Sequence, residues 1–239
     1  MSRYTDGTYL HDNPTWHAED SAWKLAHVRR GLARAEIAAP RTVCDLGCGS
    51  GELVKLWAKA QPEISFTGYD ISPQALSLCK QNAPQNTVFV SGQNIPDGPF
   101  DVALALDVIE HIENETAWLK NAAGVAQTLV LHIPLELSLY TRLRSSWLAE
   151  QRRVVGHIHF YTPRAVEQLL AQQNLRVLSW HYTNKYVERP PQLNSLTSKI
   201  GMCVRKVLHT LLPRRVAALT VGGYSVLCVV SRGKASGAV

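Results

Sequence analysis

The sequence predicts a doubly wound α/β fold, in which a mostly parallel β-sheet is covered by helices on both faces. Short apolar runs of strand length alternate along the chain with segments of helical periodicity. The first of these runs, Thr42–Leu46, leads directly into a glycine-rich turn and then a helical pattern over Glu52–Ala60. Several later runs end in a polar or acidic residue, as strands that point at a ligand site do.

The composition agrees with one large α/β domain. The chain has 239 residues, of which 46% are hydrophobic and 18% charged. It has no apolar run as long as the ~20 residues of a membrane span, and its N-terminus lacks an apolar signal region. Five scattered cysteines favour a reducing compartment, so a cytoplasmic protein is expected.

Charge is unevenly distributed along the chain, whose net charge is +6. Residues 1–150 hold 12 Lys/Arg against 17 Asp/Glu, whereas residues 151–239 hold 13 Lys/Arg against 2 Asp/Glu. The basic C-terminal third suits an anionic substrate, a membrane surface or nucleic acid, or is simply a solvated face.

Seven segments are predicted to be strands because they are apolar, of strand length and bounded by turn residues. They are Thr42–Leu46, Ile64–Tyr69, Thr87–Val90, Phe100–Asp107, Gly124–His132, Leu175–Tyr182 and Tyr224–Ser231. Helices are predicted over Glu19–Ile37 and Glu52–Ala60, and after the hydroxyl–proline pairs Ser72-Pro73 and Thr162-Pro163, which supply an N-cap and a first turn.

The turn after the first strand holds glycines at alternate positions, Gly47, Gly49 and Gly51. Glycine allows positive φ and lets a ligand lie directly on the main chain, while N–H groups at the helix start attract a polar or negative group. A dinucleotide site would need a third glycine where Glu52 or Val54 stands, so that ligand class is disfavoured.

Asp70 ends the second strand roughly 20 residues beyond this turn, where a carboxylate can accept hydrogen bonds from both ribose hydroxyls. The fourth strand similarly runs into Asp107 and His111, and the fifth ends at His132. Ligands of open α/β sheets lie beyond the carboxyl ends of the strands, so these side chains are expected to face one site.

The run Val-Cys-Asp-Leu-Gly-Cys-Gly-Ser-Gly, residues 43–51, resembles the first motif of class I S-adenosylmethionine-dependent methyltransferases. The block Phe-Asp-Val-Ala-Leu-Ala-Leu-Asp-Val-Ile-Glu-His-Ile, residues 100–112, resembles the fourth-strand motif of the same family. The resemblance spans residues 13–231 and implies a single Rossmann-like domain over residues 1–239. That domain would have about seven strands with the last antiparallel, an N-terminal leader and helix over 1–40, and a helical insertion over 185–220.

The same resemblance implies S-adenosylmethionine as cofactor. The Gly47–Gly51 backbone, Cys48 included, would cradle its methionine part, with Asp45 orienting it. Asp70 would bind the ribose, Ile71 would lie against adenine, and Asp107 would face the cofactor. Many relatives carry an acid near Gln93, so here Gln93 or Asn94 would have to reach the adenine amino group through a side-chain carbonyl.

Catalysis would be an in-line transfer of a methyl group, which requires alignment and exclusion of water but no protein nucleophile. A hydroxyl acceptor would be helped by a base, for which His111 and His132 are the candidates, with His157 and His159 as further ones. No metal site is expected, because Cys44 and Cys48 have no second pair at zinc spacing.

Two segments are expected to border the site. The leader around Trp16 and His17 either covers the bound ligand or only packs on the domain. Residues 193–211 are predicted to form a helix at the acceptor entrance, either packed on the domain or lying on an anionic membrane. Its apolar positions recur at helical spacing: Leu193, Leu196, Ile200, Val204, Val207, Leu208 and Leu211.

The sequence therefore predicts a cytoplasmic methyltransferase, or one peripheral to the inner face of the membrane, with a small-molecule, lipid or glycan acceptor. Two alternatives stay open: a non-catalytic module that binds an adenosyl ligand, and a nucleic-acid methyltransferase. Nucleic acid is disfavoured because no aromatic residue interrupts the basic stretch between Lys199 and Arg215. Nothing in the sequence predicts an oligomeric state.

Overall fold

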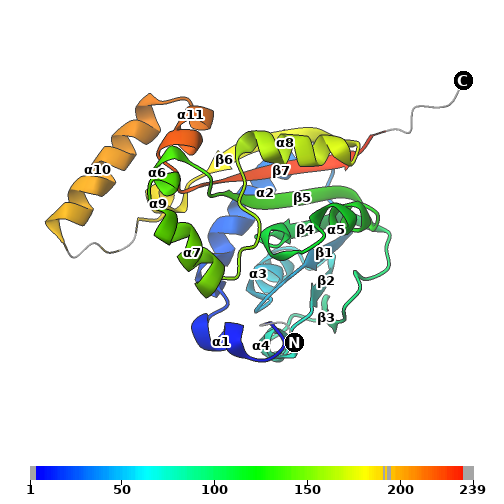
Figure 1. The fold of residues 1–239 in the computed structure, drawn as a ribbon. Helices are drawn as coiled ribbons and strands as arrows, with labels where there is room; N and C mark the ends of the chain where they lie inside the picture. The colour runs from blue at the N-terminus through cyan, green and yellow to red at the C-terminus, as the bar shows by residue number, and fades with distance from the viewer. Residues whose placement is uncertain (1–3, 191, 193–194, 234–239) are drawn as a thin grey trace, which may run out of the picture.

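The computed structural model describes residues 4–190, 192 and 195–233. Its centre is one seven-stranded sheet in the order β3-β2-β1-β4-β5-β7-β6 (Figure 1). Strand β7 runs antiparallel to both of its neighbours, and every other adjacent pair of strands is parallel. The predicted fold class, with its antiparallel last strand, is confirmed.

The strands lie close to the predicted segments. Their bounds are β1 Thr42–Leu46, β2 Ser65–Asp70, β3 Thr87–Ser91, β4 Phe100–Leu106, β5 Ala126–Leu135, β6 Leu175–Thr183 and β7 Tyr224–Arg232. The helices of four or more residues are α1 Thr8–Asp12, α2 Ser21–Arg34, α3 Glu52–Ala60, α4 Pro73–Cys79, α5 Glu115–Ala122, α6 Leu139–Arg142, α7 Ser145–Val154, α8 Pro163–Gln172, α9 Lys185–Glu188, α10 Leu196–Leu211 and α11 Arg214–Thr220. Two short 3-10 turns cover Ala18–Asp20 (η1) and Ile109–His111 (η2).

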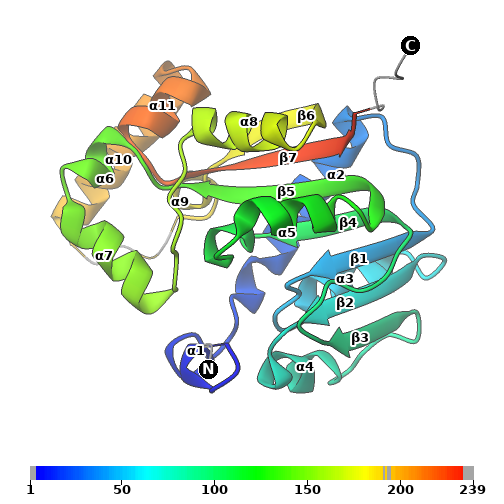
Figure 2. The same cartoon turned by 45° about the vertical axis from the view of Figure 1, so that its right-hand side comes forward.

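Helices cover both faces of the sheet, and each face has its own hydrophobic core (Figure 2). Helices α2 and α3 pack on one face through residues such as Val28 and Trp57. Helices α5, α8 and α11 pack on the other through residues such as Leu119, Val166 and Ala217. Two buried cores fix the sheet rigidly, and this positions the loops at the carboxyl ends of its parallel strands.

The structure differs from the predicted elements at specific places. Strand β4 stops at Leu106 because Asp107 has a left-handed backbone, with φ 59°. Helices α1, α5, α6 and α7 were not predicted, and the helix predicted over 193–211 runs from Leu196 to Leu211. Leu193 lies outside the described residues.

Helix α10 lies between β6 and β7 in the chain, and its apolar stripe faces solvent. Ile200, Val204, Val207 and Leu211 are all exposed, the last at 72%. The helix instead contacts the domain through its polar side. Arg205 Nη1 donates to the Gly222 carbonyl at 2.8 Å, and His209 Nδ1 lies 2.6 Å from the Tyr224 hydroxyl. The expectation that the stripe packs on the domain is therefore wrong.

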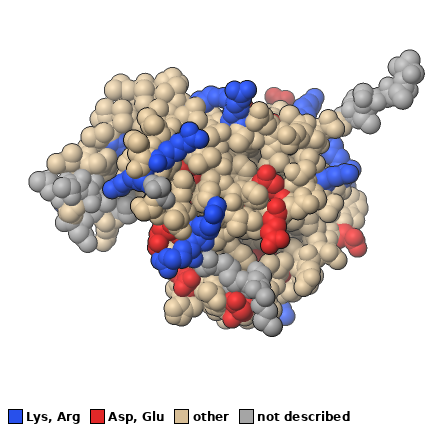
Figure 3. Space-filling model, in the orientation of Figure 1, with Lys and Arg blue, Asp and Glu red and all other residues tan. Residues whose placement is uncertain are grey.

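Positive and negative side chains are unevenly distributed over the surface. In the view of Figure 3, Lys and Arg lie mainly over the upper and left part of the molecule, and most Asp and Glu lie in the lower half. Among the residues that the structure describes, no helix is long and apolar enough to cross a bilayer.

Candidate active site

A cavity of about 520 Å³ opens at the carboxyl ends of β1, β2 and β4. Gly47 and Gly49 follow β1, Asp70 ends β2 and Asp107 follows β4, and all four line this cavity. The parallel strands bring these residues together from positions up to 60 apart in the chain, as predicted for ligand sites of open α/β sheets. The volume suits a ligand of cofactor size.

The glycine turn needs glycine at each position for a physical reason. Gly47, Gly49 and Gly51 have φ of 80°, 55° and 70°, which side-chain-bearing residues adopt at a cost. A Cβ on Gly47 would lie 2.6 Å from a methyl of Val108, and one on Gly51 would lie 2.8 Å from the Phe89 ring. The turn is closed by the N–H groups of Gly47 and Cys48, which both donate to the Tyr69 carbonyl. Gly47, Gly49 and Ser50 line the cavity, where the lack of a side chain on the glycines lets a ligand approach the main chain.

Asp70 connects the end of β2 to the glycine turn and lines the cavity. Its carboxylate accepts hydrogen bonds from the N–H groups of Gly49 and Ser72, each at 2.9 Å. Burial raises the pKa of Asp70 against the effect of these hydrogen bonds. Asp45, at the end of β1, is 4% exposed and lines the same cavity, and burial raises its pKa to about 7.

The leader lies over the glycine turn. Trp16 and His17 both line the cavity and both have a left-handed backbone. A Cβ on Gly49 would lie 3.5 Å from the Trp16 ring, which packs against Tyr9 with ring centroids 4.8 Å apart. Its indole Nε1 is buried and makes no hydrogen bond within the described part of the chain. A buried donor of this kind is suited to a polar ligand atom in the cavity.

Asp107 is held by a cation and an imidazole. Its two carboxylate oxygens lie 2.7 Å from Lys24 Nζ and 2.6 Å from His132 Nδ1. These charges keep the pKa of Asp107 well below its usual range although burial alone would raise it. Sequence reasoning missed Lys24, because it comes from α2 and no local pattern connects it with β4.

His132 is not placed as a base. Its Nε2 lies 2.9 Å from the Thr183 hydroxyl, its Nδ1 pairs with Asp107, and only 3% of the residue is exposed. It is not among the described residues that line the cavity. The structure therefore places the His132 ring between Asp107 and Thr183 and not in the cavity wall.

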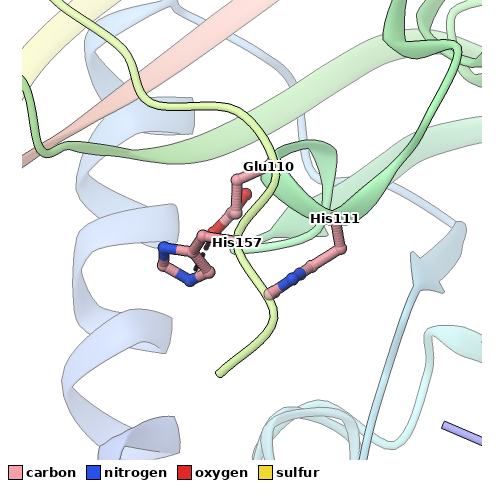
Figure 4. Close-up of side chains that lie close together, drawn as sticks. All are labelled: Glu110, His111 and His157. Atoms are coloured by element: carbon pink, nitrogen blue, oxygen red, sulfur yellow. Dashed lines mark ion pairs between the residues drawn. The ribbon is translucent and has the colours of Figure 1, made fainter. Parts of the chain in front are cut away.

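His111 does line the cavity, beside Glu110 and His157 (Figure 4). The possible ligand atoms of these three side chains all lie within 4.8 Å of one another. Glu110 has no exposed surface, and neither of its oxygens finds a hydrogen-bond partner among the described residues. Both histidines were predicted from the sequence as candidate bases, whereas Glu110 was given no role.

The predicted adenine contacts are only partly assembled. Ile71 lines the cavity and is 39% exposed. Gln93 and Asn94 are exposed and do not line it, so the structure does not bring their side chains to the site. His159 lies outside the cavity wall as well, with Nε2 2.9 Å from the Ile112 carbonyl.

The fold and this cleft define a class of α/β proteins that bind a nucleoside-like ligand on a glycine turn and a strand-end carboxylate. A family model described as a methyltransferase domain matches residues 16–180, which is most of the chain. The chain therefore belongs to the methyltransferase domain family.

Curated relatives match over shorter stretches. Trans-aconitate 2-methyltransferase of Methylobacterium nodulans is 33% identical over 95 residues, 38% of this chain and 36% of the relative. Ubiquinone biosynthesis O-methyltransferase of Rhodopseudomonas palustris is 24% identical over 132 residues, 52% of this chain and 49% of the relative. The chain thus matches about half or less of the length of these relatives, whose acceptors differ.

Solved structures share the fold across most of the chain. Magnesium protoporphyrin IX methyltransferase from Synechocystis PCC 6803, with bound SAH, has a TM-score of 0.58 at 18% identity, covering 93% of this chain and 86% of that one. A chain from the complex of the Haloferax volcanii Trm112 methyltransferase activator with a methyltransferase has a TM-score of 0.66 at 15% identity, covering 98% and 97%. At these identities the likeness shows the fold alone.

Proposed function

We propose that this chain binds S-adenosylmethionine in the cavity and transfers its methyl group to a small-molecule, lipid or glycan acceptor. The observation that carries the proposal is the joint placement of the Gly47–Gly51 turn, Asp45 and Asp70 around one cavity at the strand ends. A main chain that a ligand can approach closely and two buried carboxylates suit the ammonium and hydroxyl groups of an amino acid joined to a nucleoside.

Each group of residues has a distinct role in this proposal. The exposed backbone of Gly47–Gly51 and the Asp45 carboxylate hold the amino-acid part of the cofactor. Asp70 is already oriented by Gly49 and Ser72, so its remaining acceptor capacity can bind ribose hydroxyls. Ile71 supplies an apolar contact for the adenine. Bound cofactor supplies an electrophilic methyl group on a sulfonium, and the leader residues Trp16 and Tyr9 exclude water from it.

The acceptor end of the cavity lies beyond Asp107, toward His111 and residues of α7 and α9. The half-buried pair of Lys24 and Asp107 lines the cavity, with a separation of 2.7 Å between the ammonium and the carboxylate. Of the two first candidate bases, His111 and His132, only His111 lines the cavity. In this proposal it accepts a proton from an acceptor hydroxyl or holds that hydroxyl in line.

A lipid or lipid-linked acceptor is favoured by the surface next to the site. The exposed apolar residues of α10 share that helix with exposed Lys199 and Lys206, and Leu139 of α6 and the following Leu143 are exposed as well. Apolar side chains flanked by lysines suit an anionic membrane surface. Peripheral membrane contact is therefore part of the proposal, although no described residue of α10 lines the cavity.

The experiment is a transfer assay with methyl-labelled S-adenosylmethionine and four acceptor pools: small hydroxylated molecules, glycans, lipid extract and RNA. We expect label in one of the first three pools, lost in Asp70→Ala and retained in Asp97→Ala, an exposed aspartate outside the cavity. Label in RNA alone would support the nucleic-acid alternative. Cofactor binding without transfer to any pool would support a non-catalytic module.

A further inference from the structure

The Glu110 side chain is a buried carboxylate without a counter-charge at hydrogen-bond distance. It lies in η2, has no exposed surface, and neither oxygen finds a hydrogen-bond partner among the described residues. Taking a carboxylate out of water without a partner costs several kcal/mol, so such groups are normally paired or coordinate a metal. Another group is therefore expected at these oxygens.

His157 faces Glu110 in the tautomer that a metal ligand needs. Its Nδ1 lies 2.7 Å from a carboxylate oxygen of Glu136, which can only accept, so Nδ1 carries the proton. The lone pair is then on Nε2, which lies 3.9 Å from Glu110 Oε1. That separation is too long for a hydrogen bond. Two ligands at ~2.1 Å from one ion are about 3–3.5 Å apart, so these two atoms would have to approach each other by about 0.4–0.9 Å.

His111 completes the set with the same orientation. The Tyr4 hydroxyl donates to the Val155 carbonyl, so it accepts from His111 Nδ1, which lies 2.8 Å away. The Gly156 carbonyl accepts from the same nitrogen at 3.2 Å. Both contacts put the His111 lone pair on Nε2. Ligating histidines are usually fixed in this way, through a carbonyl or a carboxylate on the other ring nitrogen.

We propose that Glu110, His111 and His157 bind one divalent transition-metal ion in the wall of the cavity, with Glu136 as the positioning residue behind His157. Two imidazoles and one carboxylate favour ions such as Mn²⁺, Fe²⁺, Co²⁺ and Zn²⁺ over Ca²⁺ and Mg²⁺. Three protein ligands leave coordination positions open toward the cavity that these residues line.

A metal ion at this site would determine which class of acceptor is methylated. This part of the inference rests on the proposed function. A metal ion in the cavity wall binds an acceptor through oxygen and lowers the pKa of a coordinated hydroxyl. The acceptor class would then be one with a hydroxyl, alone or beside a second oxygen; the metal would stabilise the oxygen nucleophile, the hydroxyl proton would pass to water, and His111 would be a ligand and not the base.

The second acidic and histidine cluster, His17, Glu19 and Asp20, does not have these properties. Asp20 already pairs with Lys185 and Arg189, and Glu19 accepts from the Thr15 hydroxyl at 2.8 Å. Its carboxylates are therefore satisfied without an ion. The contrast identifies the cluster around Glu110 as the metal site.

The test is a Mn²⁺ titration of the chelator-treated full chain, followed by the loss of the free-ion electron paramagnetic resonance signal. Mn²⁺ is chosen because it avoids the free thiols that Zn²⁺ and Co²⁺ would bind. We expect one Mn²⁺ per chain and at least ~10-fold weaker binding in each of Glu110→Gln, His157→Gln and His111→Gln. Glu136→Gln is expected to weaken binding ~10-fold through His157.

The matched control is His159→Gln, which removes a histidine from the same segment but not from the cavity wall, and it should bind as the wild type does. Thermal unfolding and S-adenosylhomocysteine affinity check that each variant is folded. If a buried variant does not fold, the half-buried His111→Gln decides. Absence of stoichiometric Mn²⁺ binding, or affinity unchanged by these ligand substitutions, would overturn the metal site. Because binding is measured without turnover, this result is independent of the transfer assay.

Discussion

Replacing Asp70 tests the ribose contact most sharply, because the carboxylate has two separable roles. It accepts from the N–H groups of Gly49 and Ser72, which supports the turn, and it faces the cavity. Asp70→Ala leaves those N–H groups without an acceptor, at about 1–3 kcal/mol of stability for each group that stays buried. Loss of affinity alone would therefore not distinguish a ribose contact from a disturbed turn.

A pair of ligands separates the two roles. A hydrogen bond between a hydroxyl and a carboxylate is worth ~1.5–3 kcal/mol, or about 10–150-fold in affinity. The wild type should thus bind 5′-methylthioadenosine at least ~10-fold more tightly than its 2′-deoxy analogue by calorimetry. In Asp70→Ala the ratio should fall to within about 3-fold, while Asp97→Ala keeps the wild-type ratio. The same ratio in Asp70→Ala and wild type would refute the ribose assignment.

Three further predictions concern stability and the surface. Burial lowers the pKa of His181 from 6.5 to about 4. Between pH 4 and pH 6.5 this histidine is therefore protonated in the unfolded chain but neutral in the folded protein. Stability should therefore fall as pH decreases through this window, by about 1 kcal/mol at pH 5 from this group, and His181→Leu should flatten the slope in urea unfolding. Gly51→Ala should cost ~1–3 kcal/mol in the same assay, because its Cβ would meet the Phe89 ring at positive φ, whereas Gly201→Ala in the open part of α10 should be neutral or stabilising. Lys199→Glu/Lys206→Glu should weaken cosedimentation with phosphatidylglycerol vesicles about 10-fold or more, and the equally exposed pair Lys59→Glu/Lys80→Glu should not; equal loss in both would show a non-specific charge effect.

The parts of the fold that sequence predicted are those with local signals. The strand and glycine turn form an unbroken run of nine residues, 43–51, and Asp70 stands directly at a strand end, so both were placed correctly from the sequence. The left-handed backbone at Asp107 was not predictable, because nothing in an apolar run marks a non-glycine residue with positive φ. Helix α7 was missed because it has only three large apolar residues, Trp147, Leu148 and Val154, among polar and charged ones, and none of its described residues is buried.

The site was predictable only where a single strand end defines it. His132 does follow an apolar run, but its ring direction depends on Thr183, which is 51 residues away. Lys24 reaches Asp107 from α2, and Glu136 reaches His157 across 21 residues. Pairs of this kind arise from the packing of elements against one another, so no spacing rule could reveal them. The exposed stripe of α10 is a similar case, because periodicity indicates an amphipathic helix but not what covers it.

The most direct test of the account is calorimetry of the full chain with S-adenosylhomocysteine. The Gly47–Gly51 turn, Asp45 and Asp70 predict one binding site per chain, with micromolar or tighter affinity, and a clear loss in Asp70→Ala. Measurements at two temperatures are needed, since a binding enthalpy can pass through zero. Folded protein that gives no heat at either temperature, with S-adenosylhomocysteine or S-adenosylmethionine, would contradict the proposed cofactor site.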